Sequence, residues 1–260
     1  MCYDKVMPEI IIFVLGLAVG SFLNVLIDRL PKDKSIIKGR SYCDHCKKPL
    51  RWYDLIPLLS FLILKGKCRN CHFSISFYYP MVELVTGVVF VLTFDHLRGG
   101  SLDIVALAYY LFILSSLIVI FFTDLKYGII PDKIVYPAIL TVSIYTIFNF
   151  QFSIFNYFLS ALGAFLFFLI LYLVTKGRGM GFGDVKLVFI LGLFLGFPKA
   201  VVAFYIAFLT GAIFGCILIV WGKKKFFGGT IPFGPYLVLG TFISLFWGEA
   251  IMYKVFRFLL

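Results

Sequence analysis

The chain has 260 residues, of which 62% are hydrophobic, 19% aromatic and only 14% charged, and its mean hydropathy is +1.01. A soluble domain of this size cannot bury so much apolar surface, so the composition excludes an ordinary soluble protein and predicts a polytopic membrane protein. The net charge of +11 does not indicate a nucleic-acid partner, because the basic residues gather in particular loops between apolar segments.

Long apolar segments recur along the chain and predict an all-α fold with about eight transmembrane helices, each judged against the ~20 residues that cross a bilayer. They span residues 10–27, 78–97, 102–123, 129–149, 154–175, 185–197, 198–221 and 231–253. The segment 185–197 is short for a full crossing. The first segment lacks a small-residue cleavage site, so we interpret residues 1–27 as a retained transmembrane helix rather than a signal peptide.

Residues 28–77 separate the first two apolar segments and carry 11 of the 24 Lys and Arg residues. The loops with Lys176 and Arg178 and with Lys223–Lys225 are also basic, whereas the alternate loops are nearly bare, with Arg98 and Lys199 as exceptions. The positive-inside rule then predicts an N-terminus outside the cell and residues 28–77 in the cytosol. We expect a cytosolic module at 28–77 and a helical membrane domain at 78–260.

The cytosolic module contains two CxxC pairs, Cys43 with Cys46 and Cys68 with Cys71, separated by 21 residues. Four thiolates supplied by two tight turns are typical of a closed structural zinc site. A module of about 50 residues is too small for a hydrophobic core alone, and a metal would stabilise it. Two disulfides are the competing interpretation, which a reducing cytosol disfavours, and a redox role would suit one pair better than two.

Two aspartates occur where a membrane protein carries few charges. Asp124 directly follows the apolar segment 102–123, and Asp184 lies between the glycine-rich run Gly179–Gly183 and the segment 185–197. A carboxylate at hydrocarbon depth is costly, so each is a candidate functional residue. The charge pattern places both at cytosolic helix ends. Taken singly, each has a structural alternative, as a helix cap or a solvated helix end.

If this protein is an enzyme, its candidate catalytic groups are carboxylates. It has no HExxH zinc-protease motif, no GxSxG serine motif and only three histidines. Two aspartates that face each other share one proton, so the ionised member acts as general base toward water while the neutral member donates a hydrogen bond to the scissile carbonyl. Gly181 and Gly183 would let the backbone bend and approach a substrate closely.

The ordered set of motifs resembles the type IV prepilin peptidases, which are membrane aspartic proteases and also leader-peptide N-methyltransferases. The motifs are Gly20–Val25 with Arg29–Pro31, the two CxxC pairs around Trp52–Pro57, Tyr79–Leu84, Thr123–Asp124 with Ile130–Asp132, Gly181–Lys186 and Ile231–Pro235. The resemblance covers nearly the whole chain. The Gly-x-Gly-Asp element alone is less specific, since it recurs in presenilin-like intramembrane proteases.

The resemblance implies Asp124 and Asp184 as the catalytic pair, with Gly181, Gly183 and Lys186 as positioning residues. It implies cleavage after a glycine at the cytosolic face of the bacterial inner membrane, between a short basic leader and the apolar helix of a prepilin or pseudopilin. It also implies methylation of the new N-terminus by S-adenosylmethionine, with the tetracysteine loop tied to that activity. Glu83 is a candidate for holding the cofactor or the substrate amine. Anionic lipid head groups are the expected partners of the basic loops.

Two other classes of protein remain as alternatives. A transporter or channel would use Asp124 and Asp184 as proton or cation sites, although such carboxylates are expected near the membrane midplane and within an internal repeat. A non-catalytic metal-binding assembly factor would leave the paired aspartates unexplained. The leading interpretation is therefore a membrane endopeptidase with methyltransferase activity.

Overall fold

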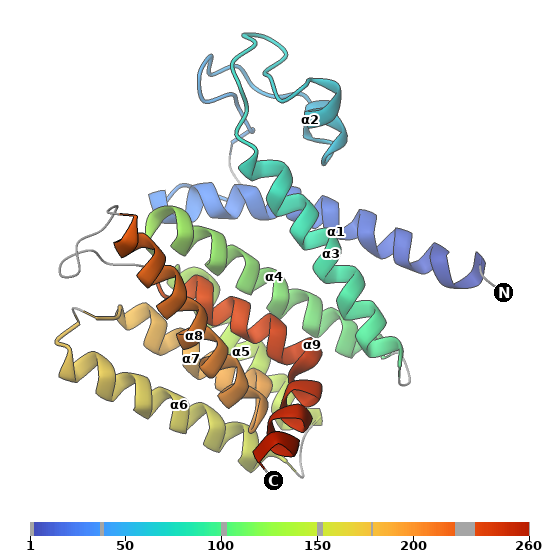
Figure 1. Cartoon of the computed structure of the whole chain (residues 1–260). Helices are drawn as coiled ribbons and strands as arrows, with labels where there is room; N and C mark the ends of the chain where they lie inside the picture. The colour runs from blue at the N-terminus through green and yellow to red at the C-terminus, as the bar shows by residue number, and fades with distance from the viewer. Residues whose placement is uncertain are drawn as a thin grey trace. The chain divides into compact units, whose positions relative to one another are not determined.

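The computed structural model describes residues 3–36, 39–99, 103–149, 153–177, 179–221 and 232–259 (Figure 1). Arg178, the basic run Lys223–Lys225 and Ile231 of the last motif lie outside these described residues. Within them the chain is helical, and its only β-structure consists of two isolated bridges. The predicted all-α membrane fold is confirmed.

The chain forms two compact units, Met1–Val119 and Ile120–Leu260, and the division falls inside one helix, α4. The first unit contains α1 (Tyr3–Arg29), the 3-10 turns η1 (Leu30–Lys32) and η2 (Trp52–Leu55), α2 (Leu59–Ile63), α3 (Tyr78–Arg98) and most of α4 (Ile104–Tyr127). The second contains the end of α4, α5 (Asp132–Asn149), α6 (Ile154–Val174), α7 (Phe182–Leu195), α8 (Lys199–Val220) and α9 (Gly234–Leu259).

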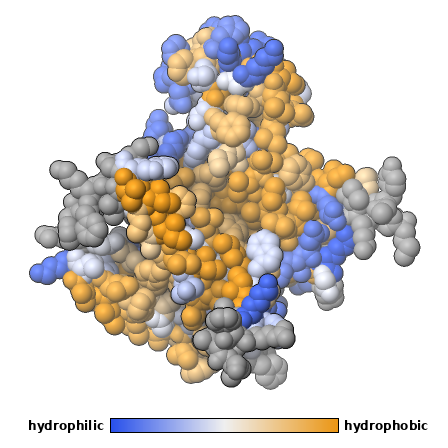
Figure 2. All heavy atoms as spheres, in the orientation of Figure 1, coloured by the Kyte–Doolittle hydropathy of each residue, from blue (hydrophilic) through white to orange (hydrophobic). Residues whose placement is uncertain are grey.

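Eight long helices correspond to the eight predicted apolar segments, and among the described residues six of them are long and apolar enough to cross a membrane. The two exceptions are α5 and α7. Helix α7 has 14 residues, about 21 Å at 1.5 Å per residue, which is shorter than a hydrocarbon core of about 30 Å. Figure 2 shows hydrophobic side chains over most of the visible helical surface, whereas hydrophilic side chains gather around the cysteine segment.

In the first unit, α1 packs against α3 through glycines. A Cβ atom on Gly16 would lie 2.7 Å from the Cα atom of Gly87, and one on Gly20 would lie 2.7 Å from the Cα atom of Glu83. Small residues let two helix backbones approach closely, which drives association where no hydrophobic effect operates between helices. The glycines therefore set the position of Glu83 beside α1.

In the second unit, the short helix α7 is the centre. It contacts α5, α6, α8 and α9, and its residues from Leu187 to Leu195 are mostly buried. Gly192 lets α7 approach Ala161 of α6, and Gly240 lets α9 approach Ala203 of α8. Helix α7 begins next to Asp184, so the packing of the whole unit determines where that carboxylate lies.

Candidate active site and metal centre

The two cysteine pairs lie in two turns with the same hydrogen-bond pattern. In the first, the Cys43 N–H donates to the Lys48 carbonyl at 3.0 Å. In the second, the Cys68 N–H donates to the Phe73 carbonyl at 2.8 Å. The residue four positions after the first cysteine closes each turn, because its N–H donates back to the cysteine carbonyl. The repeated turn presents both thiols of each pair to the same side.

The four sulfur atoms fit a tetrahedral metal site. The Sγ atoms of Cys43, Cys46, Cys68 and Cys71 all lie within 4.8 Å of one another, and those of Cys43 and Cys71 are 3.8 Å apart. Tetrahedral zinc with Zn–S bonds of about 2.3 Å would separate two sulfurs by ~3.8 Å. None of the four is in a disulfide. Backbone N–H groups of Cys71 and Asn70 lower the pKa of Cys68 to about 7, which favours the thiolate that a metal needs. The group is therefore able to bind a metal ion.

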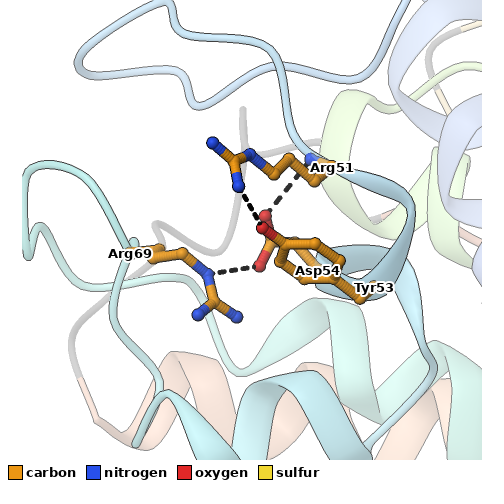
Figure 3. Close-up of polar contacts among 4 residues, drawn as sticks. All are labelled: Arg51, Tyr53, Asp54 and Arg69. Atoms are coloured by element: carbon orange, nitrogen blue, oxygen red, sulfur yellow. Dashed lines mark hydrogen bonds and ion pairs between the residues drawn. The ribbon is translucent and has the colours of Figure 1, made fainter.

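A polar network ties the segment between the pairs to the second turn (Figure 3). The Asp54 carboxylate accepts hydrogen bonds from Arg69 Nε at 2.8 Å and from the Arg51 backbone N–H at 3.2 Å. Its side chain is 6% exposed. The Tyr53 ring lies 4.8 Å from the guanidinium group of Arg69 and 5.8 Å from that of Arg51, and Arg51 Nη1 donates a hydrogen bond to the Tyr53 hydroxyl at 2.6 Å. Asp54 therefore links the chain before α2 to the second pair of cysteines.

Glu83 joins the cysteine segment to the α1–α3 pair. Its Oε2 atom accepts a hydrogen bond from the Leu58 backbone N–H at 2.9 Å, where Leu58 adopts a positive φ of 56°. In the same helix pair, Asn24 Nδ2 donates to the Tyr79 carbonyl at 3.1 Å, while Asn24 Oδ1 is buried without a hydrogen-bond partner. The structure thus gives Glu83 an anchoring contact that the sequence did not predict.

Asp184 is the third residue of α7 and is buried. Its Oδ2 atom accepts a hydrogen bond from the Gly181 N–H at 3.1 Å, so one carboxylate oxygen does cap the helix. The other oxygen, Oδ1, is buried without a hydrogen-bond partner. The helix cap that the sequence offered as one alternative is therefore present on Oδ2, and it leaves Oδ1 available for another partner.

Asp124 lies near the end of α4 and is also buried. The backbone N–H of Gly234, the first residue of α9, interacts with its carboxylate, while Asp124 Oδ2 has no hydrogen-bond partner. A Cβ atom on Gly234 would lie 2.6 Å from that oxygen. A larger residue at position 234 would therefore require this carboxylate to shift.

The two carboxylates lie in the second unit, next to stretches of backbone that meet at Ile130. The side chain of Ile130 lies beside both Gly183 and Gly234. A Cβ atom added to Gly183 would lie 3.1 Å from this side chain, and one added to Gly234 would lie 3.4 Å from it. Two neighbouring buried carboxylates cannot both be ionised without a large cost, so such a pair is suited to sharing one proton. Asp124 Oδ2 and Asp184 Oδ1, which have no hydrogen-bond partner, are therefore the two oxygens that could take part in acid–base catalysis.

Lys186 does not contact either aspartate through a hydrogen bond in the described part of the chain. Its Nζ atom forms an ion pair with Asp132 Oδ1 at 2.7 Å and lies over the rings of Phe182 and Tyr136. This contact joins the first turn of α7 to the first turn of α5. Lys186 is thus placed to hold the helix end that carries Asp184.

The sequence did not predict the contact between Gly234 and Asp124. The signal was present, because Gly234 and Pro235 interrupt the apolar pattern at the start of the last segment. Without the tertiary structure, however, a membrane turn and a functional loop have the same pattern. The role of Asp132 as the partner of Lys186 was also missed.

The chain is similar to known proteins over most of its length. Residues 14–97 match the sequence profile of the bacterial peptidase A24 N-terminal domain, and residues 111–216 match that of the type IV leader peptidase family. A prepilin leader peptidase/N-methyltransferase of Bacillus subtilis is 34% identical, and the alignment covers 93% of this chain and 95% of the relative. The protein of the same name from Aeromonas salmonicida is 32% identical over 93% of this chain and 91% of the relative. No solved structure matches significantly.

The relatives cover the first unit with the cysteines as well as the second unit with the aspartates. Their names do not favour a transporter. The described helices and these relatives together indicate a multi-pass protein of the bacterial inner membrane. The chain belongs to the type IV leader peptidase family.

Proposed function

We propose that this protein is a membrane aspartic endopeptidase that removes the leader of a type IV prepilin or pseudopilin after a glycine. The observation that carries the proposal is the pair Asp124 and Asp184, both buried, each with one carboxylate oxygen that no protein group satisfies. Unpartnered buried acceptors are costly, so their retention favours a role with a water or a substrate.

In the proposed mechanism, the ionised aspartate removes a proton from water while the neutral one donates a hydrogen bond to the scissile carbonyl. The water oxygen then forms a bond to the carbonyl carbon. As the tetrahedral intermediate collapses, the C–N bond breaks and the leaving amine takes up a proton from the pair. The Gly181 N–H holds Asp184 in place through Oδ2 and leaves Oδ1 for the reaction.

We further propose that the protein methylates the new N-terminal amine. S-adenosylmethionine would supply an electrophilic methyl group. Glu83 and the unsatisfied Oδ1 of Asn24 are candidates to hold its ammonium group, because both offer buried acceptors in the same pair of helices. The metal bound by the four cysteines is proposed to be zinc, and residues 28–77 are proposed as the platform for this second activity.

The orientation is part of the proposal. The positive-inside pattern places the N-terminus outside, and it places residues 28–77, the end of α4 and the start of α7 in the cytosol. A basic leader gains nothing from the basic loops of this protein. Anionic lipid head groups are therefore the proposed partner of those loops.

The decisive experiment measures cleavage of a membrane-embedded precursor by wild type, Asp124→Asn and Asp184→Asn, with folding and metal content checked for each variant. Both variants should lose at least about a thousandfold in kcat, because each removes a group that acts in the transition state. Metal content should stay unchanged, because the cysteines belong to the other unit. Near wild-type cleavage by either variant would refute the aspartate pair as the catalytic groups.

A further inference from the structure

A groove in the second unit lies between α6 and α8. It has a volume of about 660 Å³ and is lined by α6 from Phe155 to Phe168, by Phe197, and by α8 from Ala200 to Phe208. Along α6 this range is about 20 Å at 1.5 Å per residue. We call it the α6/α8 groove.

The lining of the groove is almost entirely apolar. Asn156 is one of its few polar residues, and both ends of the Asn156 amide are satisfied by the backbone of Phe197, at 2.9 and 3.1 Å. The remaining polar lining residues are Ser160 and Tyr205. An occupant of this groove must therefore be apolar along its length.

At one end of the groove, aromatic rings pack between it and the aspartate site. Phe168 and Phe208, which line the groove, lie 6.3 and 5.2 Å from the ring of Phe233. Phe233 directly precedes Gly234, and a Cβ atom added to Gly234 would lie 2.6 Å from Asp124 Oδ2. One end of the groove is thus separated from Asp124 by Phe233 and Gly234, and the other end lies at Phe197, in the loop between α7 and α8.

The α6 wall has the small residues that a helix needs for close approach. Ser160, Gly163 and Ala164 line the groove at helical spacing. A Cβ atom on Gly163 would meet no atom within 4 Å, so space is open above this glycine. Small residues at such spacing let a second helix backbone approach closely, which a lipid chain does not require.

We propose that the α6/α8 groove receives the apolar helix that follows the cleaved bond in the precursor. This inference rests on the proposed function, because it assigns a site to the segment immediately after the scissile bond. The helix would begin at the aspartates and lie along α6 toward the loop at Phe197. Binding the helix here would place the peptide bond before it next to Asp124.

The first test fills the groove at Gly163. The variant Gly163→Trp adds a large side chain where the protein itself leaves space. The matched control is Leu162→Trp, because Leu162 is 39% exposed on the same helix but does not line the groove. Two substrates are compared: a full precursor with its apolar helix, and a short peptide that ends a few residues after the scissile bond.

Gly163→Trp should raise KM for the full precursor about tenfold or more, and should leave cleavage of the short peptide unchanged. Leu162→Trp should change neither. Normal cleavage of the full precursor by Gly163→Trp would overturn the groove assignment and indicate that lipid fills the groove. Failure of the wild type to cleave the full precursor would instead contradict the proposed function itself.

A second measurement does not depend on the folding of Gly163→Trp. A photoreactive phenylalanine is placed at Phe167, which lines the groove and is 54% exposed, or at Phe158, which is 55% exposed on the opposite side of α6. The background is Asp184→Asn, so that the precursor stays uncut. A crosslink to the precursor helix is expected from position 167 and not from 158. A crosslink from 167 only to lipid or to a second copy of this chain would overturn the inference.

Discussion

The cysteine group and the aspartate pair hold their reactive atoms in opposite ways. The cysteines lie in two short turns whose hydrogen bonds close within a few residues, at 43–48 and 68–73. The aspartates come from the end of α4 and the start of α7, and a residue from the start of α9 supports them. The comparison shows that a metal group can be specified locally, whereas a carboxylate pair depends on the packing of distant helices.

The largest expected effect comes from breaking the local group. The variant Cys46→Ser removes one of the four sulfurs and should abolish metal binding, because structural zinc stabilises such modules by about 10–16 kcal/mol. Methyl transfer should fall with it, while leader cleavage should stay within about threefold of wild type. Metal analysis and the two activity assays measure this. Cys216→Ser, at an exposed free thiol, is the control. An equal loss of cleavage would show that the two groups are not independent.

The next effect tests how the distant helices support the aspartates. The variant Gly234→Ala places a methyl group 2.6 Å from Asp124 Oδ2 if nothing moves, so the carboxylate must shift. We expect kcat for leader cleavage to fall about a hundredfold, with metal content unchanged. The control is Gly99→Ala, where the nearest atom to the added Cβ is 3.8 Å away. Full activity of Gly234→Ala would mean that this contact does not position Asp124.

The smallest effect concerns the polar network of Figure 3. The variant Asp54→Ala leaves the Arg51 N–H and the Arg69 guanidinium without their acceptor, and should destabilise the cysteine segment by about 1–3 kcal/mol. The expected result is faster release of metal to a chelator, measured with a metal-sensitive dye. Asp54→Asn retains an acceptor oxygen, so its rate of metal release should lie between those of the wild type and Asp54→Ala. If Asp54→Ala releases metal at the wild-type rate, the network does not stabilise the module.

The structure also explains why Asp184 admits two descriptions. From sequence it was either a helix cap or a reactive group, since both occur at helix starts. In the structure Oδ2 accepts a hydrogen bond from Gly181 and Oδ1 stays unsatisfied. The cap fixes the orientation of the side chain, and this orientation leaves the other oxygen available.

The pattern of apolar segments predicted the number of long helices and the short length of α7, but not that this helix is enclosed by its neighbours. The sequence places an apolar run at 185–197, and such a run is compatible with a buried core helix or a short crossing. The structure makes α7 the centre of the second unit, in contact with α5, α6, α8 and α9. Neighbouring helices, and not the run itself, decide that α7 is enclosed.

The sequence alone determined the features that depend on composition and on short spacings. These are the membrane class, the all-α fold, the four-cysteine group and the family motifs, because each is set by residues a few positions apart. Only the tertiary structure decided that Gly234 lies against Asp124, that Lys186 pairs with Asp132, and that the α6/α8 groove ends at Phe233. These contacts join residues that are far apart in the chain, and helix packing brings them together through close approaches that no local pattern encodes.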